Sequence, residues 1–298
     1  MKLMIKLILL IYIFGGELSI TNAQGIKEIN YYLGQKPPGE IPQIFNLGIS
    51  DKKSFTAERI AISRDQSEIY YMELDGYPEM DGLHHTMRTK RYIFKNEEWI
   101  GPETVFEGYG SPSFSKGGDT LFLQNKGLEN AYICVRQKDG WTKPRRILSN
   151  LKNAHYLQET DKGNFFAATI PMEGPGAVDR TRLIFTKQDT MAASLNAPVN
   201  SKGNDLDFFV ARDESYIIFV SQSRLKITFC DSRGNWSNPA DLGSKINFGL
   251  AAWGPYVTYD NKYLFYTTGT KPDYSDTRIY WVRIDGLFER LKNNQPVK

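Results

Sequence analysis

The sequence has little cysteine, little histidine and no strong excess of charge of either sign. Its 298 residues include two cysteines and three histidines, and the formal net charge is +3. Nucleic-acid binding calls for a basic stripe, which does not stand out here, so we expect no nucleic-acid partner. Cys134 and Cys230 lie in separate strand-like runs, where we expect two buried thiols, although an oxidising compartment would permit a disulfide.

Long hydrophobic runs are also scarce, and the one that stands out is at the start of the chain. Lys2 and Lys6 precede a mostly apolar run, and Thr21-Asn-Ala23 offers small residues for cleavage before Gln24. This pattern predicts a secretory signal peptide over residues 1–23 and a periplasmic or secreted protein. No cysteine lies near the predicted cut, and no later stretch is apolar enough to span a membrane.

Motifs of catalytic or metal-binding centres are missing as well. The chain has no Gly-x-Ser-x-Gly, the nucleophile motif of α/β-hydrolase domains. His84-His85 is a poor chelate, because neighbouring residues on an extended strand point to opposite sides. Asp81 and His155 would complete a metal site only if that loop folded inward. We therefore expect no metal and no cofactor.

What the chain does contain is a repeated turn between two strand-like segments. Anchored at positions 65, 117, 161, 213 and 260, each copy places an apolar residue four positions after the anchor. The copies are Ser63-Arg-Asp-Gln-Ser-Glu-Ile-Tyr-Tyr71, Ser115-Lys-Gly-Gly-Asp-Thr-Leu-Phe-Leu123, Glu159-Thr-Asp-Lys-Gly-Asn-Phe-Phe-Ala167, Ala211-Arg-Asp-Glu-Ser-Tyr-Ile-Ile-Phe219 and Thr258-Tyr-Asp-Asn-Lys-Tyr-Leu-Phe-Tyr266. Spacings of 52, 44, 52 and 47 residues between the anchors, with only short strands inside, are typical of propeller blades.

Each repeat reads as four strands, from an inner strand a to an outer strand d. Trp-x-x-Pro, at Trp99, Trp141 and Trp236, is expected to end strand c and open strand d. The last repeat lacks this motif, and the segment from Pro42 to Leu47 is expected to supply its outer strand near Trp281. The sequence thus predicts an all-β, five-bladed propeller over residues 42–293, after a leader at 24–41 and before a tail at 294–298. A sixth, degenerate blade from residues 24–56 and 285–298 is the alternative.

The Ser-x-Asp-x-x-x-Ile/Leu-Phe/Tyr turn and the Trp-x-x-Pro strand resemble the TolB-type, WD-repeat-like propellers of bacterial envelope proteins. The resemblance covers roughly residues 42–290, with departures at Gly117 and before Pro198. It implies an exported binding or scaffolding module rather than a particular activity. Sialidase propellers are a weaker match, because the Asp turn here precedes strand b and lacks their tryptophan.

Propeller topology gathers the d–a and b–c connections on one face, where ligands usually meet the central channel. The b–c loops are long in repeats one, three and five, at residues 73–87, 171–179 and 267–277. Seven candidate ligand-binding residues are expected on this face. They come from the starts of the inner strands, found by counting back from the anchors, and from the arginines just before strand c. They are Glu58, Tyr109, His155, Arg182, Asp207, Trp253 and Arg278.

Carboxylates, arginines and aromatic rings at one channel mouth suit a polar ligand such as a glycan or a peptide. The plainer interpretation is that these side chains solvate loops and cap the channel. We expect a protein that binds such a ligand or an envelope partner. The alternative is a carbohydrate-active hydrolase with Glu58 and Asp207 as its carboxylate pair. A purely architectural role would need a broad exposed apolar patch.

Overall fold

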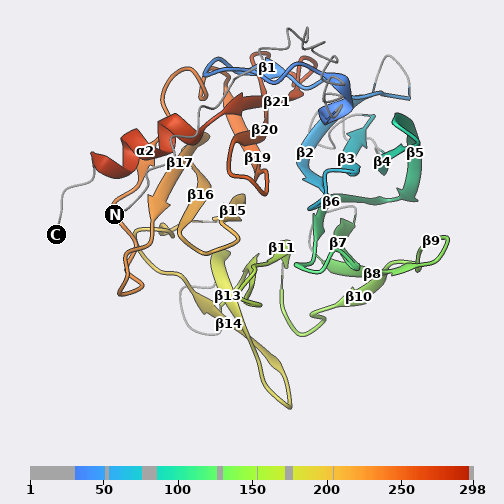
Figure 1. The fold of residues 1–298 in the computed structure, drawn as a ribbon. Helices are drawn as coiled ribbons and strands as arrows, with labels where there is room; N and C mark the ends of the chain where they lie inside the picture. The colour runs from blue at the N-terminus through green and yellow to red at the C-terminus, as the bar shows by residue number, and fades with distance from the viewer. Residues whose placement is uncertain are drawn as a thin grey trace, which may run out of the picture. The chain divides into compact units, whose positions relative to one another are not determined.

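The chain folds as a five-bladed β-propeller. A computed structural model describes residues 31–294, apart from 51–53, 76–85, 126–129, 153, 172–176 and 204. Figure 1 shows five antiparallel sheets around a common centre, with β2, β6, β11, β15 and β19 as the inner strands. The predicted fold class is confirmed, and the five-bladed arrangement holds rather than the six-bladed alternative.

The sheets follow one another along the chain, each from its inner to its outer strand. Blade 1 contains β2 (Phe55–Ile62), β3 (Glu68–Leu74), β4 (Met87–Lys95) and β5 (Glu98–Glu107); blade 2 contains β6 (Tyr109–Phe114), β7 (Thr120–Asn125), β8 (Ala131–Gln137), β9 (Gly140–Trp141) and β10 (Arg145–Ile147). Blade 3 contains β11 (His155–Glu159), β12 (Phe165–Thr169), β13 (Asp179–Phe185) and β14 (Thr190–Ser194); blade 4 contains β15 (Phe208–Val210), β16 (Tyr216–Ser221), β17 (Arg224–Phe229) and β18 (Ala240–Asp241). Blade 5 contains β19 (Ala251–Val257), β20 (Tyr263–Gly269), β21 (Arg278–Arg283) and β1 (Gln43–Ile44).

The repeated aspartates shape the turns between strands a and b, as predicted. Asp65 accepts the Ser67 amide at 3.0 Å through its Oδ1 atom, and Asp213 accepts the Ser215 amide at the same distance. An aspartate that bonds the backbone two residues ahead fixes a tight turn. The apolar residues four positions after the anchors are fully buried in four blades, and half-buried at Phe165 in blade 3.

The N-terminal strand closes the ring. Gln43 pairs with Trp281 and Ile44 with Tyr280, which confirms the predicted donation of an outer strand to blade 5 (Figure 1). Phe45 is 1% exposed, and its ring centroid lies 5.1 Å from those of both Phe265 and Trp281. Closure therefore combines a backbone ladder with an aromatic core contact.

The same segment continues as a polar clamp onto blade 1. The Ser50 amide donates to Glu73 at 2.6 Å, and the Gly48 amide donates to the Tyr92 hydroxyl at 3.0 Å. Glu73 is fully buried and also accepts from Arg88 at 3.1 Å, so its charge is compensated inside the fold. Residues 43–50 thus join the last blade to the first.

Two details of the predicted blades are wrong. The tryptophans follow the turn between strands c and d instead of ending strand c, since Trp99 lies in β5 and Trp141 forms β9. In blade 3 the outer strand is β14, which precedes Pro198, and this explains why no tryptophan stands before that proline. Cys134 is buried as predicted, but Cys230 is only partly buried; both are free thiols.

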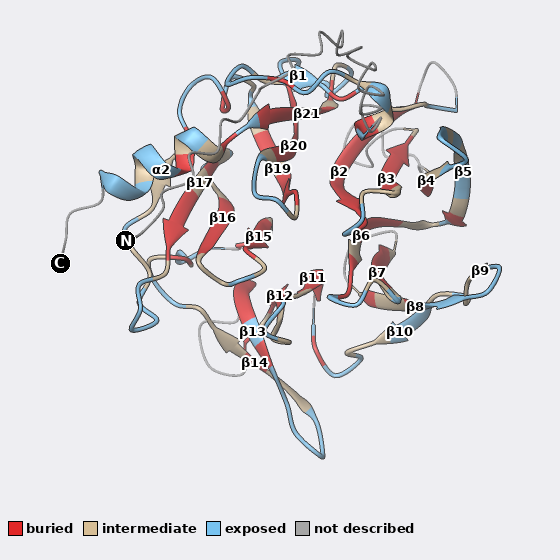
Figure 2. Ribbon diagram, in the orientation of Figure 1, coloured by how far each residue is buried: buried red, intermediate tan, exposed pale blue. Residues whose placement is uncertain are grey.

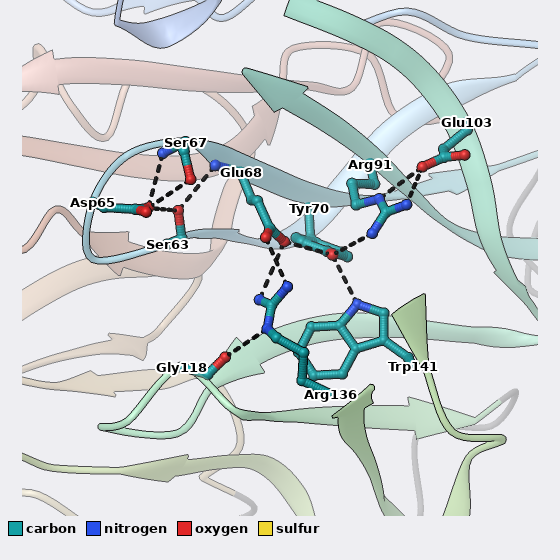
Figure 3. A network of polar contacts seen from close by, with 10 residues as sticks. All are labelled: Ser63, Asp65, Ser67, Glu68, Tyr70, Arg91, Glu103, Gly118, Arg136 and Trp141. Atoms are coloured by element: carbon teal, nitrogen blue, oxygen red, sulfur yellow. Dashed lines mark hydrogen bonds and ion pairs between the residues drawn. The ribbon is translucent and has the colours of Figure 1, made fainter. Parts of the chain in front are cut away.

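A polar network joins blade 1 to blade 2 near the turns between strands a and b (Figure 3). The Trp141 indole donates to the Tyr70 hydroxyl at 2.9 Å, and Arg136 donates to Glu68 at 2.8 Å. Each bond links a blade 2 side chain to strand β3, so the misplaced tryptophan motif acts as a contact between blades.

Burial is greatest on the inner strands and falls toward the outer ones (Figure 2). The helix α2 (Asp285–Asn293) follows β21 and buries Phe288 against Tyr216 of blade 4, with ring centroids 5.0 Å apart. The short η1 (Tyr32–Gly34) places Tyr32 against Trp281 at 5.3 Å. Among residues 31–294 as described, no helix is long and apolar enough to cross a membrane.

Candidate functional site

The inner strands share an irregularity that gives the channel its polar lining. Strands β2, β6, β11 and β19 each shift register in their middle, at a residue with positive φ: Glu58 (61°), Ser111 (47°), Tyr156 (50°) and Gly254 (59°). Such bulges re-aim the side chain that they contain. In blade 4 the corresponding position is Asp207, immediately before β15.

Three of these residues meet across the channel, although their blades are not all neighbours. The Tyr156 hydroxyl contacts Glu58 Oε2, and it lies 3.1 Å from Asp207 Oδ2. The Gly254 amide donates to the same Asp207 oxygen at 3.0 Å. Blades 1, 3, 4 and 5 therefore converge on one group of atoms, which we call the channel cluster: Glu58, Tyr156, Asp207 and Gly254.

A fully buried arginine supports the cluster from within. Arg59 donates to the Phe208 carbonyl at 2.5 Å and to the Tyr156 carbonyl at 3.4 Å, and its guanidinium carbon lies 4.5 Å from the centroid of the Tyr156 ring. Burial lowers its pKa to about 10, which still leaves it charged at neutral pH. The cation ties the inner strands of blades 1, 3 and 4 together and faces both carboxyl groups.

A second buried arginine lies behind Asp207. Arg180 donates to Asp205 at 3.0 Å and to the Val199 carbonyl at 2.7 Å, and its positive charge favours the ionised form of Asp207. Arg212 faces Arg59 from the end of β15. Three guanidinium groups thus accompany the carboxyls of Asp205, Asp207 and Glu58.

The proton count of the cluster requires one protonated carboxyl. The Tyr156 hydroxyl contacts one oxygen of Glu58 and one oxygen of Asp207. Each of these two contacts needs a proton between its oxygens. The phenol supplies one proton, so a carboxyl must supply the other. Two ionised carboxylates on one phenol would also repel each other in a buried setting.

Glu58 is the carboxyl that keeps the proton. Burial and the nearby Asp207 raise the pKa of Glu58 to about 8. Burial also raises the pKa of Asp207. Tyr156 and Arg59 favour the ionised form of both carboxyls, Trp253 favours that of Glu58, and Gly254 and Arg180 favour that of Asp207. At neutral pH the protonated Glu58 donates to Tyr156, and Tyr156 donates to the Asp207 carboxylate.

Trp253 completes the site next to Gly254. Its side chain hydrogen-bonds Glu58, and its half-buried ring meets Tyr274 edge-on at 6.1 Å. Asp207 is half-buried too, whereas Glu58 and Tyr156 are buried. Asp207 and Trp253 are therefore less buried than the Glu58 and Tyr156 that they contact.

At the other end of the channel, toward the a–b turns, residues shortly after the inner strands contact one another. Arg212 lies 3.5 Å from the centroid of the Tyr259 ring and Arg64 lies 5.4 Å from it. Arg64 also pairs with Asp161 at 3.5 Å. Nearer the cluster, the Tyr256 hydroxyl bonds the backbone of Ile62.

The seven residues predicted from the sequence do not all lie together. The structure brings Glu58, Asp207 and Trp253 into one site, and His155 directly precedes Tyr156 in β11. His155 is 8% exposed, and burial lowers its pKa to about 4, so it is neutral at physiological pH.

Three predicted residues have other contacts. The Tyr109 ring lies against Tyr132 at 5.0 Å, Arg182 donates to Asn164 in the a–b turn of blade 3, and Arg278 donates to the Thr277 carbonyl. Arg182 pairs with Phe166 near the a–b end of its strand, which places it away from the ligand face. Of the long b–c loops, residues 76–85 and 172–176 lie outside the described residues, and with them Asp81, His84 and His85.

Sequence reasoning missed Tyr156, Arg180 and Gly254. Tyr156, Asp207 and Gly254 each lie four residues before the last residue ahead of the turn in their blade: Thr160, Ala211 and Thr258. The same offset gives Arg59 rather than Glu58 in blade 1 and does not reach Arg180, so spacing alone does not identify this set.

No protein-family model matches the chain, and no curated protein matches it. Solved structures similar to it include TolB from Acinetobacter baumannii, with 16% identity, 75% of this chain and 53% of that chain covered, and a TM-score of 0.43. Others are the periplasmic gluconolactonase PpgL of Pseudomonas aeruginosa (11%, 74% and 70%, 0.41) and the β-propeller domain of Cps50 (Swd1) from Myceliophteria thermophila (14%, 76% and 65%, 0.40). TolB is thus among the proteins that this chain resembles, as the sequence predicted, and the chain spans about half of the TolB length. At these identities the likeness concerns the fold alone.

Proposed function

We propose that this protein is an exported propeller that binds a neutral, hydroxyl-rich ligand, a glycan, at the end of its channel where the inner strands begin. Asp207 and Trp253 make the first contacts. The observation that carries the proposal is the half-buried Asp207, whose carboxyl contacts Tyr156 and Gly254, beside the half-buried Trp253, which hydrogen-bonds Glu58. Export is inferred from the first 23 residues of the sequence and from no structural feature.

The contacts favour a sugar on chemical grounds. Asp207 receives the Tyr156 and Gly254 donors on Oδ2, and its carboxylate is suited to accept a ligand hydroxyl through Oδ1. The Trp253 ring offers an aromatic surface for the apolar face of a sugar ring. Prealigned polar groups beside an aromatic surface are typical of small-ligand sites.

Charge favours a neutral ligand over a cationic one. With Glu58 protonated, the described residues around the cluster pair Arg59, Arg180 and Arg212 with Asp179, Asp205 and Asp207, so positive and negative charges balance there. A lysine side chain or a peptide amino terminus would therefore gain no net attraction from the charge of the channel.

The test is calorimetry with maltotetraose, cellotetraose and chitotetraose, and with tetralysine as the peptide probe. Asp207→Asn should cost about 1.5–3 kcal/mol of binding free energy, roughly 10- to 100-fold in Kd, because a charged acceptor is lost. Trp253→Ala should also weaken binding, and Arg182→Ala, at the other end, should not. Tetralysine binding instead of a glycan, or equal binding by Asp207→Asn, Trp253→Ala and the parent, would contradict the proposal.

The runner-up is hydrolysis of a glycosidic bond, for which one observation speaks: the cluster pairs a protonated with an ionised carboxyl. However, the Tyr156 phenol stands between the two groups, so a substrate cannot lie there. An enzyme would need Asp207 as base and Tyr156 as the donor of the Glu58 proton. Chromogenic glycosides with the parent and Asp207→Asn decide: absent turnover, or turnover unchanged by the substitution, eliminates this candidate.

A further inference from the structure

We propose that Tyr156 and Glu58 are positioning residues that hold Asp207 ready for its ligand only while the three groups share two protons, so that binding in the channel is linked to pH. This inference rests on the proposed function, because it concerns the same site. It adds how that site is regulated and which buried residues determine its shape.

When the cluster loses its carboxyl proton, its two hydrogen bonds can no longer both form. One phenol then faces two carboxylates, and it can donate to only one of them. In the other contact, the phenol oxygen and a carboxylate oxygen face each other with no proton between them. They repel each other, because water screens charge poorly in these buried surroundings. One of the two carboxylates must move away.

Asp207, rather than Glu58, is the carboxylate that moves. Glu58 is fixed: it lies in the middle of β2, Trp253 bonds its side chain, and the Thr267 hydroxyl donates to its carbonyl at 3.0 Å. Asp207 lies ahead of β15 and is half-buried. It is therefore Asp207 that turns from Tyr156, and the ligand loses its aligned acceptor.

Four charged or titratable groups among the described residues surround the pair. Those facing Glu58 and Asp207 from their own and neighbouring strands are Arg59 in β2, Tyr156 in β11, Arg180 in β13 and, behind Arg59, Arg212 after β15. Burial keeps the pKa of Tyr156 well above its usual range, and the arginines stay charged. Glu58, with a pKa of about 8, is the member of this set that titrates in the range of use.

Conservative variants distinguish residues that position Asp207 from residues that only stabilise the fold. Glu58→Gln keeps a hydrogen-bonding side chain of similar size that cannot lose a proton. Tyr156→Phe keeps the ring under Arg59 but removes the bridge. Glu103→Gln, on the outer strand of blade 1 where it pairs with Arg91, is the control for an exposed carboxylate.

The experiment measures the Kd of the tetrasaccharide that binds, by calorimetry from pH 6 to pH 10, for the parent and the three variants. The parent and Glu103→Gln should bind with constant affinity below about pH 7 and lose about tenfold per pH unit above about pH 8. Glu58→Gln should show no such loss, and Tyr156→Phe should bind more weakly at every pH. At pH 9 the parent should take up close to one proton on binding, seen by comparing buffers of different ionisation enthalpy.

A second readout needs no ligand. Because Trp253 bonds Glu58, its emission should titrate near pH 8 in the parent and not in Glu58→Gln. Affinity of the parent that is independent of pH, an equal loss in Glu58→Gln, or a parent emission without this titration would each overturn the inference. Failure of the proposed function looks different: no tetrasaccharide binds at any pH, while the emission titration persists.

Discussion

Gly254 lies directly against the backbone of Glu58. A Cβ on Gly254 would stand 2.6 Å from the Glu58 carbonyl carbon, and the residue has a φ of +59°. Blade 5 can approach blade 1 this closely only because a hydrogen takes the place of a side chain. The same residue directs its amide at Asp207, so one glycine determines both the joint and the cluster.

Gly254→Ala should therefore destabilise the protein, by about 2–4 kcal/mol if the backbone cannot yield. Gly108→Ala is the matched control, because Gly108 also has positive φ (+78°) but has nothing within 4 Å of the added Cβ. Urea denaturation of both variants separates contact from backbone strain, and equal losses would show that the contact with Glu58 costs nothing.

The contribution of Glu58 to the stability of the protein should fall as pH rises from about 5 to about 8. Glu58 has its pKa raised from 4.5 to about 8, so between these values the folded protein holds a proton that the unfolded chain has released. Unfolding then becomes easier by up to about 1.4 kcal/mol per pH unit. The free energy of unfolding of the parent, measured by denaturation relative to that of Glu58→Gln, should fall across this range; a difference that stays constant with pH would contradict it.

His155 should produce the opposite slope at lower pH. Burial lowers its pKa from 6.5 to about 4, so the unfolded chain binds a proton that the folded protein refuses. The contribution of His155 to stability should therefore fall as pH drops from about 6.5 to about 4. His155→Gln should lose less stability than the parent over this interval, as followed by urea denaturation at pH 4, 5, 6 and 7. An unchanged difference between the two proteins across these pH values would speak against this assignment.

Ring closure should depend on Phe45 more than on its neighbour in the sequence. Phe45→Ala removes a fully buried ring between Phe265 and Trp281 and should cost about 3–5 kcal/mol. Ile44→Ala, on the same segment but 43% exposed, should cost less than about 1 kcal/mol. Thermal melts of both variants test this, and similar melting temperatures would mean that the closing segment does not stabilise the ring through its core contact.

The blades were predictable because their signals are local. An aspartate turn such as that of Asp65 and an apolar residue four positions later, such as Ile69, need no knowledge of distant partners. In blade 3 the tryptophan that precedes the proline in other blades is absent. The prediction used Pro198 alone and placed the outer strand after its actual position, Thr190–Ser194. The closing strand was found by elimination, since one repeat lacked a partner.

The site was predicted only in part, for a reason of register. On a strand, a shift of one residue moves a side chain to the other face. Because of its bulge, blade 3 places Tyr156 in the channel, and not only His155. At the corresponding position blade 2 has Ser111 and not Tyr109. Glu58 and Asp207 were reached, but the phenol that joins them was not, because neither composition nor spacing reveals a bulge.

Closure by β1 also has a consequence for how the molecule acquires its structure. Gln43 and Trp281 belong to opposite ends of the described chain, so this pairing has about the largest sequence separation that the fold contains. Contacts between residues so far apart form slowly, because a long loop must be ordered before they yield any stabilisation. Until β21 is in place, Ile44 and Phe45 have no sheet to join. An interval with unpaired sheet edges therefore precedes the native state, and its length governs how much chain is lost to aggregation.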